Sequence, residues 1–162
     1  MTIPLKSPNY AGDHLRHPVV LVMLVMWGVN DHYLKAVYGN WWTGKASDVC
    51  GLVVFSVTLY SSYELYWAFR KVPPPHLKLA LYCSLFVTGG LLTSINLIPC
   101  MESLCSQGIA YLQWPFQAAL SWLISEKIPS LAALKTTMDS SDLLTLPALL
   151  IPYWIITPTL KT

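Results

Sequence analysis

The stretch NDHYLKAVYGNWWTGKASDVCG, residues 30 to 51, decides how this chain folds. It holds two of the ten cations, two of the eight anions and one of the four histidines, and an apolar run lies on each side of it. Because charged groups are costly inside lipid, such a segment belongs at a membrane interface or just within one. The rest of the chain is interpreted outward from this segment.

The composition points to a membrane protein. Of 162 residues, 54% are hydrophobic and only 11% are charged, whereas a soluble domain carries about 25% charged residues. Seven Trp and nine Tyr suit a protein that meets two membrane–water interfaces. We therefore predict an all-α integral membrane helical bundle of four or five transmembrane helices.

The charge balance excludes one class of partner. A net charge of +2 with scattered cations does not make a nucleic-acid surface. The predicted partners are the lipid bilayer and either further copies of the chain or a larger membrane complex. Residues 1–17 form a polar N-terminal segment with no cleavage site after the first apolar run, which predicts an uncleaved anchor. Residues 18–158 form the transmembrane domain and 159–162 a short tail.

The first two spans flank the opening stretch. Pro18 suits a first helical turn, but Val19 to Val29 is too short to cross a bilayer, which needs about 20 residues. This helix must therefore continue through Asn30-Asp31-His32 to about Tyr38. The second span is expected over residues 49–69, with Ser47 or Asp48 as its cap.

The later spans are less regular. A third is predicted over residues 77–98, and a poorer one over 108–125, where Pro115 lies inside. Residues 128–138 read as a connector, and a last kinked span covers 143–156 with Asp139 or Ser141 as its cap.

The placement of Lys and Arg predicts the orientation. Five spans put seven of these cations on the N-terminal side and three on the other, whereas four spans give six and four. The more polarised five-span count is favoured, and both counts place the N-terminus in the cytoplasm. The predicted location is a bacterial inner membrane.

Two cysteines lie outside under either count. Cys100 and Cys105 follow the third span in a segment without Lys or Arg, where oxidation to a disulfide would close a small hairpin loop. The alternative is two unlinked thiols. Their spacing differs from that of redox or zinc motifs, and no metal site is predicted.

The first candidate site is Asn30, Asp31, His32 and Lys35. Ionisable groups within a membrane often mark function, as an ion or proton relay or a head-group site. The alternative is that these groups already lie at the interface and end the helix, because only about eleven apolar residues precede Asn30.

The second candidate runs from Thr43 through Lys45 and Ser47 to Asp48. Gly39-x4-Gly44-Lys45 matches part of a phosphate loop, but Ala46 stands where Ser or Thr would bind magnesium. Backbone N–H groups here, with Lys45, could instead bind a lipid phosphate. The simpler interpretation is a helix cap with Lys45 at the head groups.

The third candidate pairs Asp139 with Asp142. Two acids in a first turn favour the helix dipole. A cation site combining them with Asp48 and His32 would require both segments on one membrane face, which four spans allow and five forbid. The sequence identifies no cofactor.

These three motifs resemble those of a loose group of uncharacterised bacterial multi-pass membrane proteins. The resemblance lies in Asn30-Asp31-His32-x-Leu34-Lys35, Thr43-Gly44-Lys45-x-Ser47-Asp48-x2-Gly51-Leu52 and Asp139-x2-Asp142-Leu143-Leu144-x-Leu146-Pro147. It covers about 30 positions. Membership would imply a membrane location and no particular activity.

Three functional hypotheses follow. The first is a non-enzymatic membrane module, either an accessory subunit or an oligomer, that works through helix contacts. The second is an enzyme or transporter that handles a polar or phosphorylated lipid head group, or an ion, at an interfacial site formed by the first two motifs. The third is ion or proton passage past Asp31, Glu64 and Asn96.

Overall fold

A computed structural model describes residues 11–125 and 138–161. Every regular element in these two ranges is helical, which confirms the predicted all-α class. Three helical segments are long and apolar enough to cross a membrane, namely Trp41–Phe69, Leu77–Leu97 and Ser140–Leu160. The N-terminal residues 1–10 and most of the expected connector at 128–138 lie outside the described residues.

The first helix continues through the polar motif, as the sequence predicted. It consists of α1 (Pro18–Val29), the π-helical turn η2 (Asn30–Leu34) and α2 (Lys35–Val37), which contain 12, five and three residues. At 1.5 Å per residue the whole is about 30 Å long. The His17 ring Nδ1 accepts a hydrogen bond from the Val19 N–H and caps its start. Gly39, with a φ of 44°, lies in the turn that follows.

The second helix begins earlier than the sequence predicted. α3 spans Trp41–Phe69, and its cap is Asn40, whose side-chain oxygen accepts from the Thr43 N–H at 3.1 Å. The expected cap at Ser47 or Asp48 is therefore wrong. Asn40 supplies the capping oxygen seven residues upstream of Ser47, and the intervening Gly44 does not interrupt the helix.

The expected cysteine loop is helical instead. α4 (Leu77–Leu97) ends where predicted, and α5 (Pro99–Ser125) starts two residues later. Cys100 and Cys105 both lie on α5 and are free thiols. Cα atoms five residues apart on a helix are about 8.6 Å apart, beyond the reach of a disulfide. Of the two alternatives that the sequence left open, the structure therefore has the two unlinked thiols.

The C-terminal segment is a short α-helix between two 3₁₀-helical segments. It consists of η3 (Ser140–Leu149), α6 (Leu150–Ile156) and η4 (Thr157–Lys161), and it starts a few residues before the expected span. The Asp139 carboxylate accepts from the Ser141 N–H at 2.9 Å, as its predicted capping role requires. Pro147 lies within η3, where its missing N–H suits a tighter helix rather than a regular α-helix.

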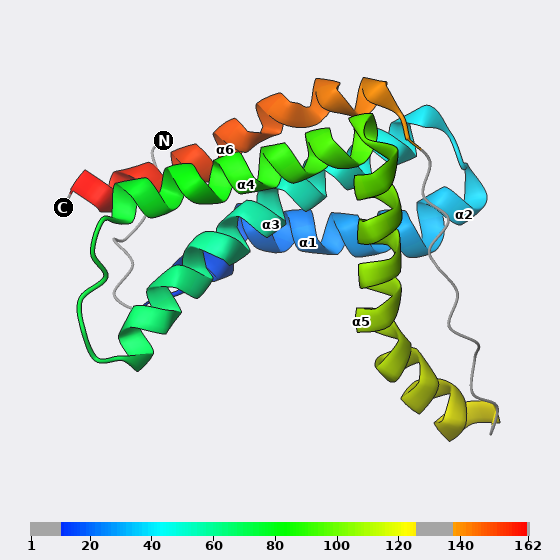
Figure 1. The fold of residues 1–162 in the computed structure, drawn as a ribbon, viewed down its shortest axis with the longest axis horizontal. Coiled ribbons are helices and arrows are strands. Elements are labelled where there is room, and N and C mark those ends of the chain that lie inside the picture. Colours follow the sequence, from blue (N-terminus) through cyan, green and yellow to red (C-terminus); the bar gives the residue numbers. More distant parts are fainter. Residues whose placement is uncertain (1–10, 126–137, 162) are drawn as a thin grey trace. The chain divides into compact units, whose positions relative to one another are not determined.

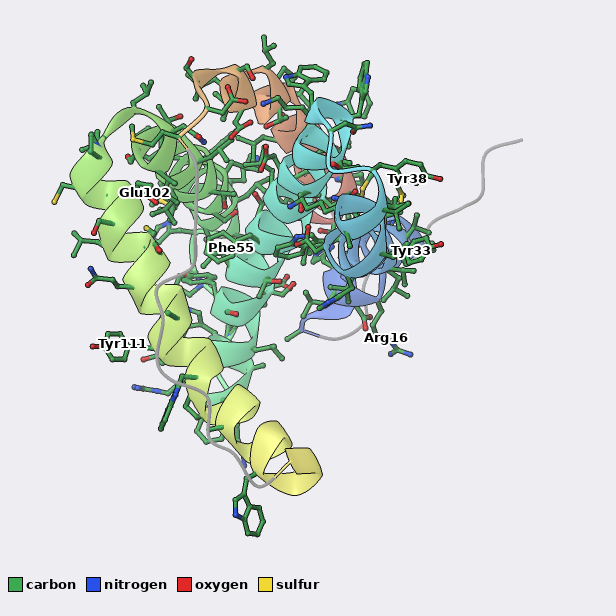
Figure 2. The ribbon with its side chains drawn as sticks, turned by 90° about the vertical axis from the view of Figure 1, so that its right-hand side faces the viewer. Arg16, Tyr33, Tyr38, Phe55, Glu102 and Tyr111 are labelled. Carbon is green, nitrogen blue, oxygen red and sulfur yellow. The ribbon has the colours of Figure 1, made fainter. Side chains whose placement is uncertain are left out.

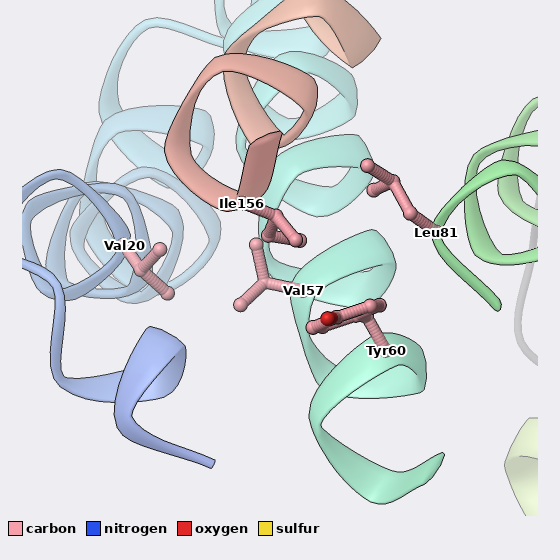
Figure 3. Close-up of a cluster of buried hydrophobic side chains, with 5 residues drawn as sticks. All are labelled: Val20, Val57, Tyr60, Leu81 and Ile156. Carbon is pink, nitrogen blue, oxygen red and sulfur yellow. The ribbon is translucent and has the colours of Figure 1, made fainter. Parts of the chain in front are cut away.

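The chain divides into two compact units. The first comprises residues 1–90 and 144–162, and the second comprises residues 91–143. In the first unit, α1, α3, α4 and α6 contribute one side chain or more each to a shared core (Figures 1 and 3). Its fully buried members are Val20, Val57, Tyr60, Leu81 and Ile156. This core joins residues that are up to 136 positions apart in the sequence.

Candidate functional site

The first two sequence motifs meet in one hydrogen-bonded cluster. The Asn30 side-chain amide donates to the Thr43 carbonyl at 2.6 Å. The Ser47 hydroxyl donates to the Asp31 carboxylate, and the Lys35 ammonium lies 2.8 Å from the same carboxylate. We call these five residues the motif cluster. It binds the end of the first helix to the beginning of α3.

The local fold explains why these side chains meet. Thr43 and Ser47 are four residues apart on α3 and therefore share one face. Asn30 and Asp31 are consecutive, and both lie in the π-turn, where they reach that same face. Single π-turns inside helices are rare and occur often at functional sites.

Burial differs sharply within this region. Asn30 is only 2% exposed, and its Oδ1 has no hydrogen-bond partner among the described residues. Lys45 is 7% exposed, and its ammonium lies 5.4 Å from the centre of the Trp41 ring. His32 is exposed. Lys45 is thus held within the protein. This differs from the interpretation of the sequence, which placed Lys45 among the lipid head groups.

Aromatic residues surround the cluster. Trp41 and Trp42 pack edge to face with ring centres 4.7 Å apart, and Trp42 is 72% exposed. Tyr33 and Tyr38 project outward from the π-turn and from the end of α2 (Figure 2). Exposed Trp and Tyr rings are typical of residues at a membrane–water interface.

The third motif makes a different contact. The Asn96 side-chain oxygen accepts from the Asp139 N–H at 3.1 Å, within the second unit. Asp142 belongs to that unit as well, whereas His32 and Asp48 belong to the first. In residues 11–125 and 138–161 there is no group of three or more His, Cys, Asp or Glu side chains that could hold a metal ion.

A second polar cluster was not predicted. His14 Nε2 lies 3.7 Å from Glu64 Oε1, and the other Glu64 oxygen accepts from the Gly12 N–H at 3.1 Å. The His14 ring packs edge to face on Tyr60, and Thr159 Oγ1 lies 3.5 Å from His14 Nε2. We call His14, Tyr60, Glu64 and Thr159 the histidine cluster.

The histidine cluster joins three remote parts of the chain. His14 lies in the short helix η1 (Asp13–Arg16) and is 4% exposed, Glu64 lies near the end of α3, and Thr159 lies in η4. The approach of His14 to Glu64 follows from the directions of the two helices. If α1 and α3 run antiparallel with Asn30 beside Thr43, residues before α1 must lie near residues late in α3.

Comparisons with protein-family models, curated proteins and solved structures find no match for this chain. The functional argument therefore rests on the two clusters and on the helices that carry them.

Proposed function

We propose that this chain is a multi-pass membrane protein with four spans, formed by α1–η2–α2, α3, α4 and Ser140–Leu160. The histidine cluster carries this proposal, because it joins residue 14, residue 64 and residue 159. Segments that touch at one membrane face are separated by an even number of crossings. Four spans satisfy this condition, and five do not.

The spacing of the two clusters supports membrane insertion of the helix pair. Ser47 and Glu64 are 17 residues apart on α3, which corresponds to about 25 Å. This is close to the roughly 30 Å thickness of a hydrocarbon core. The polar groups then lie at the two interfaces, with mainly apolar helix between them.

The outer surface of α1 supports the same placement. Most of its side chains are apolar and exposed, which would be unfavourable in water and suits contact with lipid. They are Val19, Leu21, Val22, Leu24, Val25, Met26 and Val29. The six-to-four distribution of Lys and Arg places both termini in the cytoplasm. The motif resemblance suggests a bacterial inner membrane.

Cysteine labelling with a membrane-impermeant maleimide tests the topology. In four spans Ser140→Cys reacts from outside, and in five spans it reacts from inside. Native Cys100, which is exposed, reacts from outside under both counts and serves as one control. Arg16→Cys, with an 83% exposed parent side chain, reacts from inside under both counts and serves as the other. Labelling of Ser140→Cys from the cytoplasmic side would refute the four-span topology.

Within this topology we propose that the protein is a non-enzymatic membrane module, an accessory subunit or an oligomer. The supporting observation is that the polar side chains of the motifs bond to other groups of the same chain. The Asp31 carboxylate is engaged by Lys35 and Ser47, and the Asn30 amide is engaged by a backbone carbonyl. These contacts make the motif residues a connection between helices.

Assembly in native-like lipid tests the module. The protein is extracted directly into polymer-bounded native nanodiscs, and its mass is measured. An oligomer or a stoichiometric partner is expected, and a lone monomer would refute the proposal. Asp31→Ala is the test variant, because loss of the connection should lower the yield of the assembly, while His32→Ala at the neighbouring exposed position should not.

One observation favours the second hypothesis, a site for a polar head group or an ion. Asn30 Oδ1 is a buried acceptor without a described partner, and it lies at the interface end of the helix pair. A ligand that donates a hydrogen bond would satisfy it. Asn30→Leu, which removes the acceptor, would then reduce retention of a co-purified lipid or ion in mass spectra of the intact protein, and unchanged retention would exclude this site.

A further inference from the structure

An open groove lies between α3 and α4 in the first unit. Its volume is about 370 Å³, and Leu59, Tyr63, His76, Leu79, Ala80, Cys83, Ser84 and Val87 line it. His76 marks one end and Val87 the other, eleven residues along α4, which corresponds to about 16 Å. That length is about half of a hydrocarbon core, the depth of one lipid leaflet.

Away from its His76 end the groove is mainly apolar, and the hydroxyl of Ser84, which also lines it, donates to the Leu81 carbonyl at 2.8 Å. The loop at the His76 end is held by a hydrogen bond from the Tyr63 hydroxyl to the Pro75 carbonyl. His76 itself adopts a φ of 52°, and its carbonyl accepts from the Ala80 N–H at 3.0 Å. Tyr63 and His76 are therefore fixed at the mouth by contacts across the groove and along α4.

The link between α3 and α4 is basic. Arg70 and Lys71 follow α3 directly, and the link ends at His76, which lines the mouth of the groove. The sequence contains no Asp or Glu between residues 65 and 101. Among the described residues none of these three side chains forms an ion pair with a carboxylate. Arg70 instead stacks on Tyr66, with its guanidinium carbon 5.9 Å from the ring centre.

We propose that this groove binds one acyl chain of an anionic phospholipid from the cytoplasmic leaflet, with the phosphate beside His76, Arg70 and Lys71. Walls one leaflet deep accept the chain, and the basic link that leads to the mouth complements the charge of the head group. The lipid forms no covalent bond. The inference rests on the membrane location and orientation proposed above and is independent of the role as a module.

Native Cys83 provides a probe inside the groove, because it lines the groove and is exposed. In a background of Cys50→Ala, Cys100→Ser and Cys105→Ser, Cys83 is labelled with bimane, and the protein is placed in nanodiscs. Increasing fractions of dibromo-chain phosphatidylglycerol or dibromo-chain phosphatidylcholine then quench the fluorophore. A matched reporter is Phe86→Cys with Cys83→Ala, because the Phe86 side chain is 81% exposed on α4 outside the groove.

The two lipids should behave differently at the two reporters. At Cys83 the quenching by phosphatidylglycerol should saturate, with an apparent affinity at least about fivefold above that of phosphatidylcholine. A factor of about five corresponds to the roughly 1 kcal/mol by which one basic residue attracts an anionic lipid surface. Arg70→Gln with Lys71→Gln should remove this preference. At Phe86→Cys both lipids should quench equally and without saturation.

Two results would overturn the inference. Equal quenching by both lipids at both reporters would leave only ordinary boundary lipid. Absence of quenching at Cys83 alone would mean that a protein helix fills the groove. Ala80→Trp, which fills the groove from α4, should abolish the selective quenching while leaving that at Phe86→Cys unchanged. The cysteine-accessibility and nanodisc-mass measurements report separately on topology and assembly, so failure of either proposal is recognised independently.

Discussion

The motif cluster allows a quantitative prediction about which of its contacts holds α1 to α3. The Asp31 carboxylate contacts Ser47 on α3 and, on its own helix, Trp27 and Lys35. Only the first contact joins two helices. Ser47→Ala removes the contact with α3, and Lys35→Met removes the ion pair within the helix. Combining each change with Asp31→Ala, which leaves no acceptor oxygen, separates their contributions.

The two contacts should differ in strength because they differ in burial. A hydrogen bond to a charged acceptor contributes about 1.5–3 kcal/mol in general, but interhelical bonds in membrane proteins average about 0.6 and reach about 1.7 kcal/mol. Ser47 is 7% exposed while the Asp31 side chain is 38% exposed, so we expect about 1 kcal/mol for this pair. The Lys35 side chain is 40% exposed, and its i,i+4 pair with Asp31 should contribute about 0.3–0.5 kcal/mol.

Double-mutant cycles measure both coupling energies directly. The free energy of unfolding is determined in lipid bicelles for the parent, the three single variants and the two double variants. The Asp31–Ser47 coupling should be about two to three times the Asp31–Lys35 coupling. Added salt should weaken the second more than the first. A Lys35 coupling equal to or above that of Ser47 would refute the assignment of Ser47 as the contact between the helices.

Three further predictions concern Gly12, the pH dependence that His17 confers, and the two cysteines of α5. Gly12 has a φ of 83°, where an alanine is strained, so Gly12→Ala should lower the free energy of unfolding by about 1–2 kcal/mol. Gly28→Ala is the control, because open space surrounds the added methyl group, and it should be neutral or slightly stabilising. Burial, with a smaller contribution from nearby His14, lowers the pKa of His17 below its usual 6.5. Between the pKa of His17 in the folded protein and its value of 6.5 in the unfolded chain, the unfolded chain therefore binds more protons. The free energy of unfolding should rise with pH up to about 6.5 and fall as the pH drops through that value. His17→Asn, which keeps a capping oxygen, should flatten this dependence in unfolding curves from pH 5 to 7.5. Cys100 and Cys105 should each take one maleimide in detergent without reductant, and a mass showing neither labelled would contradict their placement on one helix.

Helix boundaries were predictable where the signal was local. Pro18, Gly39 and the three prolines at 73–75 mark their positions by backbone chemistry alone, and the structure agrees there. The start of α3 was misplaced because Asn40, Ser47 and Asp48 are all competent caps, and no propensity chooses among them. The sequence predicted a loop around Cys100 and Cys105, whereas Pro99 is the first residue of α5, a position that suits its fixed φ.

The candidate site divides in the same way. The sequence singled out Asn30, Thr43 and Ser47 as costly polar residues but left their partners open. The four-residue spacing of Asp31 and Lys35, in contrast, already indicated the ion pair that the structure contains. Tertiary packing supplies those partners, because Thr43 and Ser47 face the π-turn only once α1 and α3 lie side by side. The contact between His14 and Glu64 was not predicted, because the two residues are 50 positions apart in the sequence.

Composition and the order of apolar runs alone determined that this is an all-helical protein suited to lipid, because the distribution of charge along a chain decides which solvent its segments can enter. Only the tertiary structure decided which polar groups pair and which ends of the chain meet. Those contacts depend on helix register and on a π-turn that shifts side chains around the helix axis, and neither is encoded in a local pattern of hydrophobicity.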